Sequence, residues 1–309
     1  MMHESHFRAM NTEIGVWLWN ANSQVDRVMA QAVHRFEEAE AELSRFRPDS
    51  GLSRLNASAG QGPQRVSPLL WTVLTHAVEA ARQTHGIFDP TLLDLLRATG
   101  YNRSFELLGN GNSSKTVAPS KSPWGWHCIR LFEAGGLVEL PAGFGIDLGG
   151  IAKGWTVDRV AVSLATHGAV LVDAGGDIRA IGAPEGQPWP VAVQDPFDET
   201  KDRAILALAD GAVATSSIGR RRWQAGGKTM HHLIDPRTGQ PSNSDLHTVT
   251  VLAKTAEAAE VAAKTALLLG TAAGADWLAQ QDLRGLLIDR RGQEHHIGRL
   301  PTYESLEMA

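Results

Sequence analysis

The sequence predicts an α+β fold, because helical patterns dominate the first third of the chain and strand patterns dominate the rest. Two long apolar stripes with a period near 3.6 residues lie before Gly86, whereas short apolar runs typical of strands follow from Val138 onward. Between them, residues 109–125 are rich in Gly, Ser, Asn and Pro, which indicates a mobile surface loop or a joint. We therefore expect a helix-rich part over about 1–108 and a strand-rich part over about 126–309.

The chain opens with a predicted strand and a long predicted helix. Apolar residues alternate with others over Ile14–Leu18, which is the pattern of a strand with one buried face. Ser23 then caps a helix whose apolar stripe extends from Val25 to Phe46, and Pro48 ends it. Arg45 falls largely outside the stripe, which places it on the polar face of this helix.

The pair Ser67-Pro68 begins a second helix, because Ser caps helices and Pro is favoured at their first position. This helix stops near Gly86, and a short third helix follows Asp89-Pro90-Thr91. The later elements that we expect are helices at about 151–167 and 257–269, a last hairpin of Gly285–Ile288 with Glu294–Ile297, and strands at Val138–Leu140, Ala169–Val172, Ile178–Ile181, Val191–Val193, Ile205–Leu208, Val213–Thr215, Met230–Ile234 and Thr248–Ala253.

Composition and charge exclude several classes of protein. The formal net charge is −5, from 29 basic and 34 acidic side chains, which leaves no large basic face for nucleic acid. The single cysteine, Cys128, excludes an internal disulfide framework and a multi-thiolate metal site. No apolar stretch is long enough to predict a membrane span, and no secretory leader is recognisable. We expect a cytoplasmic protein without a nucleic acid partner; its oligomeric state stays open.

Two glycine-rich stretches invite a nucleotide-binding interpretation, although neither has the spacing of a P-loop or of a Rossmann fingerprint. Asp173–Asp177 leads from one strand into another, which favours a turn. Gly149–Gly154 follows a strand end at Ile146 and enters a helix, where backbone N–H groups attract anions. Lys153 can reach a phosphate there, and Asp147 can accept hydrogen bonds from a sugar or a ring. The alternative is a structural turn with a surface lysine.

Two further motifs have both a chemical and a structural interpretation. Phe88–Thr91 forms an Asp-Pro turn, in which Thr91 caps the next helix if the role is purely structural. His231 and His232 are adjacent at a strand end, so their rings face opposite sides and are a poor metal-ligand pair. A single general base is the chemical interpretation, and a hydrogen-bonded structural histidine is the alternative.

Taken together and in this order, the motifs resemble the ApbE family of FAD:protein FMN transferases. Each motif is weak alone, but the ordered series is specific and spans residues 10–270, nearly the whole chain. The matching segments are Met10-Asn11-Thr12, Leu43-Ser44, Pro48-Asp49-Ser50, Leu52–Asn56, Gly86–Thr91, Ile146–Gly154, Ala174–Asp177, His232–Gly239 and the helix Glu257–Gly270.

The resemblance implies a protein that splits FAD, attaches FMN by a phosphoester bond to an exposed Ser or Thr of a target protein, and releases AMP, with magnesium. It implies one domain over residues 1–309, built as two closely packed subdomains with a flavin-binding cleft between them. It gives His232 the role of activating the acceptor hydroxyl, and the Gly150 carbonyl that of a metal ligand. The residues that it places at or near FAD are Met10, Ser53, Asn56, Ile87, Phe88, Asp89, Asp147, Lys153 and Leu233.

This chain departs from the family pattern at three places that matter. Ser216-Ser217-Ile218 stands where the family often has Ser or Thr, then Ser-Gly before an aromatic residue. Asn11 replaces a glycine, and Asn tolerates positive φ better than most residues. Glu260 and Lys264 stand where the family's late helix has Asp and, four residues later, Thr. Glu260 keeps a carboxylate for the metal, but protonated Lys264 cannot ligate and repels magnesium; the two side chains can also form an i,i+4 ion pair. We expect Lys264 to act as a built-in cation beside the pyrophosphate, with weakened magnesium binding.

Two alternatives to an FMN transferase stay open. The first is an FAD pyrophosphatase, in which water replaces the protein hydroxyl and the products are FMN and AMP. The second is an FAD-binding protein that has lost catalysis, which Lys264 favours and which Asp147, Lys153 and His232 oppose.

Overall fold

The computed structural model describes residues 1–19, 24–105, 124–225 and 228–303. The chain forms two compact units, each assembled from segments that are far apart in the sequence. Unit 1 comprises Met1–Glu37, Lys153–Ser217 and Ser244–Ala309, and unit 2 comprises Glu38–Ala152 and Ile218–Asn243. The predicted cap Ser23 and nearly all of the loop predicted at 109–125 lie outside the described residues. The single domain with a flavin cleft stays a prediction.

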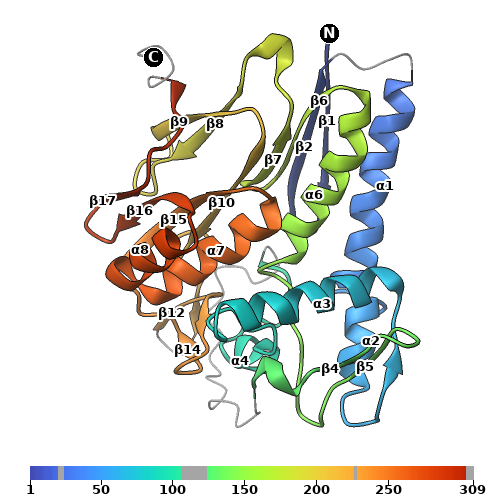
Figure 1. The fold of residues 1–309 in the computed structure, drawn as a ribbon. Helices are drawn as coiled ribbons and strands as arrows, with labels where there is room; N and C mark the ends of the chain where they lie inside the picture. The colour runs from blue at the N-terminus through green and yellow to red at the C-terminus, as the bar shows by residue number, and fades with distance from the viewer. Residues whose placement is uncertain (20–23, 106–123, 226–227, 304–309) are drawn as a thin grey trace. The chain divides into compact units, whose positions relative to one another are not determined.

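Unit 1 is built on an eight-stranded antiparallel sheet (Figure 1). Its strand order is β1-β2-β6-β7-β10-β15-β16-β17, so the first and last segments of the chain share one sheet. The bounds of these strands are β1 Met2–Ala9, β2 Thr12–Trp19, β6 Ala169–Ala174, β7 Asp177–Ile181, β10 Gly211–Ser217, β15 Leu246–Ala253, β16 Arg284–Asp289 and β17 Glu294–Ile297.

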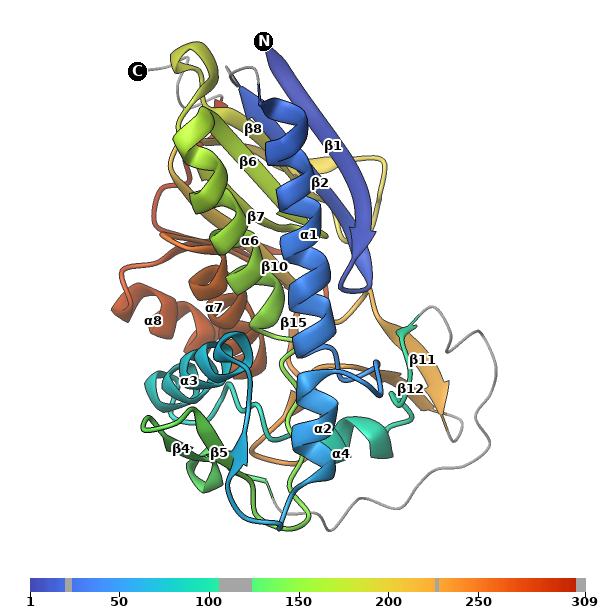
Figure 2. The ribbon, with the colours of Figure 1, turned by 90° about the vertical axis from the view of Figure 1, so that its right-hand side faces the viewer.

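Helices cover one face of this sheet. Figure 2 shows α1 (Val25–Leu43) and α6 (Ala152–Leu164) over the same strands. Val16 and Leu18 of β2 are buried in a core cluster with residues of α1 and α6, while their neighbours Trp17 and Trp19 pack into a second cluster on the other face. The period-2 alternation of the strand therefore sorts its side chains into two cores. Nearby, α7 (Ala256–Leu269) packs on β10 and β15, and α8 (Thr271–Gln280) packs on α7.

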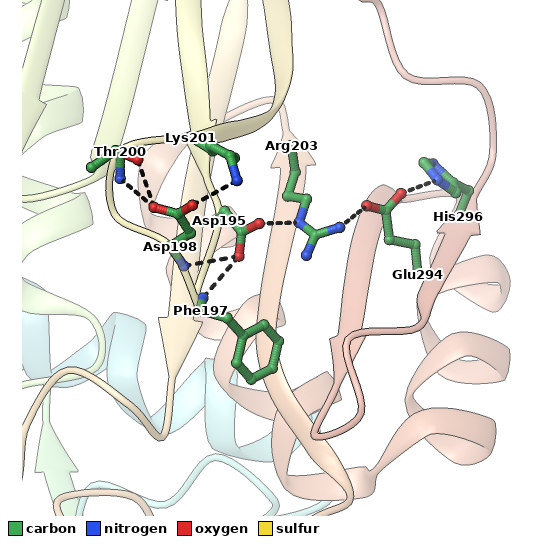
Figure 3. A network of polar contacts seen from close by, with 8 residues as sticks. All are labelled: Asp195, Phe197, Asp198, Thr200, Lys201, Arg203, Glu294 and His296. Carbon is green, nitrogen blue, oxygen red and sulfur yellow. Dashed lines mark hydrogen bonds and ion pairs between the residues drawn. The ribbon is translucent and has the colours of Figure 1, made fainter.

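A separate hairpin of β8 (Trp189–Gln194) and β9 (Asp202–Leu208) contributes apolar residues to that second cluster. Polar contacts join the end of this hairpin to β17 (Figure 3). Arg203 donates to Asp195 at 2.8 Å within the hairpin and to Glu294 of β17 at 3.3 Å. The N–H of Phe197 and the Arg203 guanidinium hold the pKa of Asp195 below its usual range. The carboxylates of Asp195 and Glu294 thus hold the Arg203 guanidinium between the β8–β9 hairpin and β17.

Among its described residues, unit 2 contains three short sheets and three helices of its own. Its apolar cluster packs Tyr101 and Trp223 with residues of α4 and β13. The elements are α2 Gly51–Ala57, α3 Pro68–Gln83, α4 Leu93–Ala98, the 3-10 turn Trp126–Cys128, the sheet of β3 (Gln64–Arg65), β5 (Leu137–Glu139) and β4 (Arg130–Phe132), the pair β11 (Arg222–Ala225) and β12 (Lys228–His231), and the pair β13 (Ile234–Asp235) and β14 (Gln240–Pro241).

The α+β fold class is confirmed, and so are most predicted elements. Ser67 caps α3 by accepting from Leu70 N–H, and the last hairpin has the predicted pairing of Gly285 with Ile297. The predicted first helix was wrong at its end, because it stops at Leu43 and Phe46 lies beyond it. The sequence did not predict β1, α2 or α8. Within the described residues, no helix is long and apolar enough to cross a membrane.

Candidate functional site

In unit 1, α6 and α7 cap each other. Asp158 of α6 accepts from the N–H groups of Ala256 and Glu257, at 2.8 and 2.9 Å, at the start of α7. In return, Glu260 of α7 accepts from Gly154 N–H in the first turn of α6, at 2.9 Å. Burial raises the pKa of Asp158 to about 6, although the two backbone donors act in the opposite direction. The exchange satisfies backbone donors that helix starts otherwise leave unpaired.

The close approach of these helices depends on a glycine. A Cβ on Gly154 would lie 2.6 Å from the carbonyl oxygen of Ala256 and 2.7 Å from Glu257 N. Such contacts are with backbone atoms, which no side-chain rotation can relieve. Gly154 therefore sets the distance at which Glu260 faces the start of α6.

Lys153 binds two buried carboxylates. Its Nζ contacts Asp177, the first residue of β7, and lies 3.0 Å from Glu260 Oε1. The three side chains are 16%, 5% and 7% exposed in the order Lys153, Asp177, Glu260. The predicted phosphate-binding turn at the start of α6 thus already has an anion, which is the carboxylate of Glu260. The prediction of a surface lysine in the structural alternative is wrong, whereas a structural role of the turn agrees with these contacts.

Two tight turns lie at one end of the sheet in unit 1. Ala9 pairs with Thr12 and Ala174 with Asp177, so Met10-Asn11 and Gly175-Gly176 are two-residue hairpin turns. All four turn residues have positive φ, as type I′ hairpins require. A Cβ on Gly175 would collide with Thr12 Oγ1, which shows that the turns are in close contact. The structure thereby confirms that Asn11 takes a positive φ, and it places Met10 partly buried against the core.

In unit 2, Asp89 organises the turn that the sequence singled out. Its Oδ1 accepts from Thr91 N–H at 2.8 Å and from Thr91 Oγ1 at 2.6 Å, and its Oδ2 accepts from Trp126 N–H. Thr91 Oγ1 in turn accepts from Gly125 N–H at 2.7 Å. Thr91 is not the cap of α4, because the residue before that helix is Leu92, whose side chain caps nothing. Phe88 is buried and Ile87 is half-buried beside this turn.

Asp147 lies in a segment without regular secondary structure rather than at a strand end, contrary to the prediction. No strand that the structure describes pairs with this segment. Instead, the Asn56 side chain makes two hydrogen bonds with the backbone of Ile146, and Asp147 N–H donates to Pro90 O. Arg45 Nε binds Asp147 Oδ1 at 2.7 Å, and the two side chains are 4% and 16% exposed. Asn56 thus supports Asp147, and Ser53 takes part in capping α2 through its N–H.

Arg45 is the residue that sequence reasoning missed. Beyond its ion pair with Asp147, Nη1 donates to Tyr101 O at 2.9 Å, and its guanidinium lies over the rings of Phe46 and Tyr101. Its buried Nη2 has no hydrogen-bond partner among the residues that the structure describes. Arg45 was assigned to a polar helix face, but the helix ends before it. The signal that could have found it is its place next to the matching segment Leu43-Ser44.

The two adjacent histidines have different surroundings, although β12 ends at His231 and His232 lies beyond the strand. His231 is structural: its Nε2 lies 3.0 Å from Ser242 O, and its Nδ1 accepts from Leu233 N–H. The His232 ring lies edge-on to Tyr101, with centroids 6.5 Å apart. Burial raises the pKa of the Tyr101 hydroxyl, so this neighbour stays neutral. Leu233 is buried and pairs through its carbonyl with Ser242 N–H.

The residues around Glu260 do not fit a magnesium ion. Both carboxylate oxygens are engaged, one by the Lys153 ammonium and one by Gly154 N–H. Lys264, half-buried one turn further along α7, offers no acceptor to a cation. Among the described residues, no group of three or more His, Cys, Asp or Glu side chains is arranged to hold a metal. Gly150 lies buried in the turn before α6, and its role as a metal ligand stays a prediction.

Comparison with known proteins gives consistent matches over most of the chain. The model of the ApbE family matches residues 10–287. An FAD:protein FMN transferase of Vibrio cholerae is 30% identical, covering 82% of this chain and 74% of that protein. One of Klebsiella pneumoniae is 28% identical, covering 91% and 83%. The solved structure of the flavin transferase ApbE from Vibrio cholerae matches with a TM-score of 0.80 and 26% identity, covering 96% of this chain and 97% of that one. The ApbE protein of Thermotoga maritima has a TM-score of 0.84 at 24% identity, covering 100% and 99%, and shows the shared fold.

Proposed function

We propose that this chain, which belongs to the ApbE family, is an FAD:protein FMN transferase. The observation that carries the proposal is the 30% identity to the transferase of Vibrio cholerae over 82% of the chain. The reaction takes FAD and a protein with an exposed Ser or Thr and yields the FMN-bearing protein and AMP. A cytoplasmic location stays a prediction.

In the proposed reaction the acceptor hydroxyl oxygen attacks the phosphorus on the riboflavin side of the pyrophosphate. A new P–O bond forms to the acceptor, the bridging P–O bond breaks, and AMP leaves with its electron pair. His232 takes the hydroxyl proton as the attack proceeds, because an imidazole is the side chain best matched to proton transfer near neutral pH. Water attacking at the same phosphorus gives FMN and AMP instead, which is the pyrophosphatase reaction.

Asp147 and Asp89 have different parts in this proposal. Asp147 has Oδ1 on Arg45, and its Oδ2 accepts from Gly149 N–H at 3.3 Å, so a ligand donor would share Oδ2 with that N–H. Asp89 already accepts three hydrogen bonds, two from Thr91 in its own turn and one from Trp126 N–H, and these fix the turn that follows Phe88. We propose that Asp147 accepts a hydrogen bond from FAD, whereas Asp89 shapes the surface on which the flavin or adenine lies. Leu233, in the same unit as Asp89 and Asp147, adds apolar contact, and Met10 as an FAD contact stays a prediction.

The test measures AMP release and covalent flavin with FAD and an acceptor protein modified by one of the similar transferases. We expect a fluorescent acceptor band that survives denaturation, together with AMP. AMP with free FMN alone would replace the transferase by the pyrophosphatase, and FAD binding without AMP would leave a non-catalytic binder.

His232→Ala tests the base directly. Removing a general base lowers turnover by about 10²–10⁴-fold, while FAD affinity changes little. The matched control is His34→Ala, since His34 is a highly exposed residue of α1 and its loss should leave turnover unchanged. His231→Ala should instead lower the stability of the protein, because the His231 ring bonds two backbone groups. An unchanged rate in His232→Ala would assign His232 to structure.

A further inference from the structure

We propose that this chain does not use a divalent cation at Glu260, because its own ammonium groups, on Lys153 and Lys264, supply the positive charge there. The proposal concerns metal binding to the protein itself and goes beyond the proposed FMN transfer. It holds whether the acceptor of the flavin is a protein hydroxyl or water.

The first observation is the position of Lys153. Its Nζ contacts Asp177 and Glu260 together, and all three side chains are largely buried. A divalent cation that used these carboxylates would have to displace the ammonium. Lys153 would then lose both of its carboxylate partners inside the protein, which is unfavourable for a buried charge. Glu260 would also have to release Gly154 N–H, which its second oxygen accepts.

The second observation is Lys264. It follows Glu260 by four residues on α7, so both side chains lie on the same face of the helix. Magnesium needs oxygen ligands in near-octahedral geometry, and an ammonium provides no lone pair. A cation bound to Glu260 would therefore have a like charge within one helical turn.

Charge balance leads to the same conclusion. The two lysines carry two positive charges, and Asp177 and Glu260 carry two negative charges, so these four groups are neutral without a metal. Asp158, which accepts from the first N–H groups of α7, has its own cation in Arg179, whose Nε lies 3.6 Å from its carboxylate. A divalent cation would leave these four groups positive, and Glu257, three residues before Glu260, is the further acidic side chain on that face of α7.

The test is a titration of the protein with Mn²⁺, followed by electron paramagnetic resonance of the free ion. We expect no saturable Mn²⁺ binding by the wild-type protein up to about millimolar Mn²⁺. When FAD is present, the Mn²⁺ bound should not exceed the amount that the same concentration of FAD binds without protein. The double variant Glu260→Asp with Lys264→Thr should bind Mn²⁺ at least tenfold more tightly. It removes the Lys264 ammonium and shortens by one methylene the side chain that carries the carboxylate. The matched control is Lys254→Thr, which removes an exposed lysine just before α7 and should leave the wild-type result unchanged.

A thermal measurement tests the position of Lys153 separately. The melting temperature of the wild-type protein should be the same in magnesium and in chelator. Lys153→Met should melt at a lower temperature in chelator and regain part of the loss in magnesium, because a cation can then replace the missing ammonium between Asp177 and Glu260. Lys201→Met, which removes an exposed lysine paired with Asp198, should show neither effect.

Sub-millimolar binding of one Mn²⁺ by the wild-type protein that Glu260→Gln abolishes would overturn the proposal. So would a double variant that gains no affinity, because Lys264 would then not be what excludes the ion. Mn²⁺ binding that survives Glu260→Gln lies elsewhere and leaves the assignment of Lys153 intact. None of these outcomes depends on whether FMN is transferred, so the two proposals fail separately.

Discussion

Gly154→Ala should destabilise the protein by forcing α6 and α7 apart. The added Cβ would lie 2.6–2.7 Å from backbone atoms of Ala256 and Glu257, whereas ordinary contacts begin near 3.4 Å. One helix must therefore move by roughly 0.8 Å, as estimated from the difference between those distances. That movement stretches the three hydrogen bonds that join the helices, two to Asp158 and one to Glu260, which now measure 2.8–2.9 Å.

The magnitude follows from opposing terms. Overpacking costs about 1–3 kcal/mol, and weakening hydrogen bonds costs about 1 kcal/mol each. Alanine returns about 1 kcal/mol through its higher helix propensity. We expect a net loss of about 3 kcal/mol, which corresponds to a melting temperature lower by about 6–12 °C for a unit of this size.

The assay is thermal and urea unfolding of Gly154→Ala beside Val162→Ala, an exposed position on the same helix, whose stability should stay within about 0.5 kcal/mol of wild type. Turnover of FAD should also fall in Gly154→Ala, because Glu260 and Lys153 shift together. A variant as stable as wild type, or more stable, would refute the close packing of the two helices.

Three further predictions address charged groups. Burial raises the pKa of Asp158 to about 6, so ionisation of this carboxyl group opposes folding. As pH rises from 4 to 7, the wild-type protein should lose stability relative to Asp158→Asn by at most about 3 kcal/mol. Urea unfolding at each pH measures this difference. Arg45→Lys should lower the stability of the protein by about 2 kcal/mol and weaken FAD binding, because a lysine ammonium cannot bond Asp147 and Tyr101 O as the guanidinium does. The control Arg47→Lys, at the exposed ion pair with Asp49, should change neither quantity. The pKa of Asp195 is low in the folded state, so Asp195→Asn should reduce the loss of stability between pH 5 and 3, and an unaltered acid limb of the pH profile would contradict that assignment.

Local patterns predicted the fold class and most elements because the relevant signals lie within a few residues of each other. Ser67 before Pro68, the alternation in β2 and the spacing of the last hairpin are all of this kind. The helix end at Leu43 could not be found in this way, since Phe46 continues the apolar period although it packs in a cluster of unit 2. Tertiary packing decided that boundary.

The contacts of the candidate site residues could not be predicted from the sequence. Lys153 was expected to reach a phosphate, and the structure instead joins it to Glu260, 107 residues away. Arg45 was assigned to solvent and is buried on Asp147. Contacts between distant segments follow from how the sheet brings β7, α6 and α7 together, and no sequence spacing encodes that arrangement.

The proposed role of Lys264 also changed with the structure. The sequence predicted one built-in cation at the altered pair, and the geometry adds Lys153 as the ammonium that holds Glu260 and Asp177. The departure from the family pattern at Glu260 and Lys264 therefore has a structural partner that the motif alone does not show.

The most direct test of the central claim is the ratio of AMP to protein-bound FMN in one reaction. FAD, the wild-type protein and an acceptor carrying a single modifiable Ser or Thr are incubated together, and a matched acceptor has Ala at that position. An FMN transferase releases one AMP for each FMN bound to the acceptor, as counted by mass spectrometry, and leaves no FMN on the Ala acceptor. Intact FAD after incubation, or AMP that forms without any flavin bound to the acceptor, would contradict the assignment as an FMN transferase.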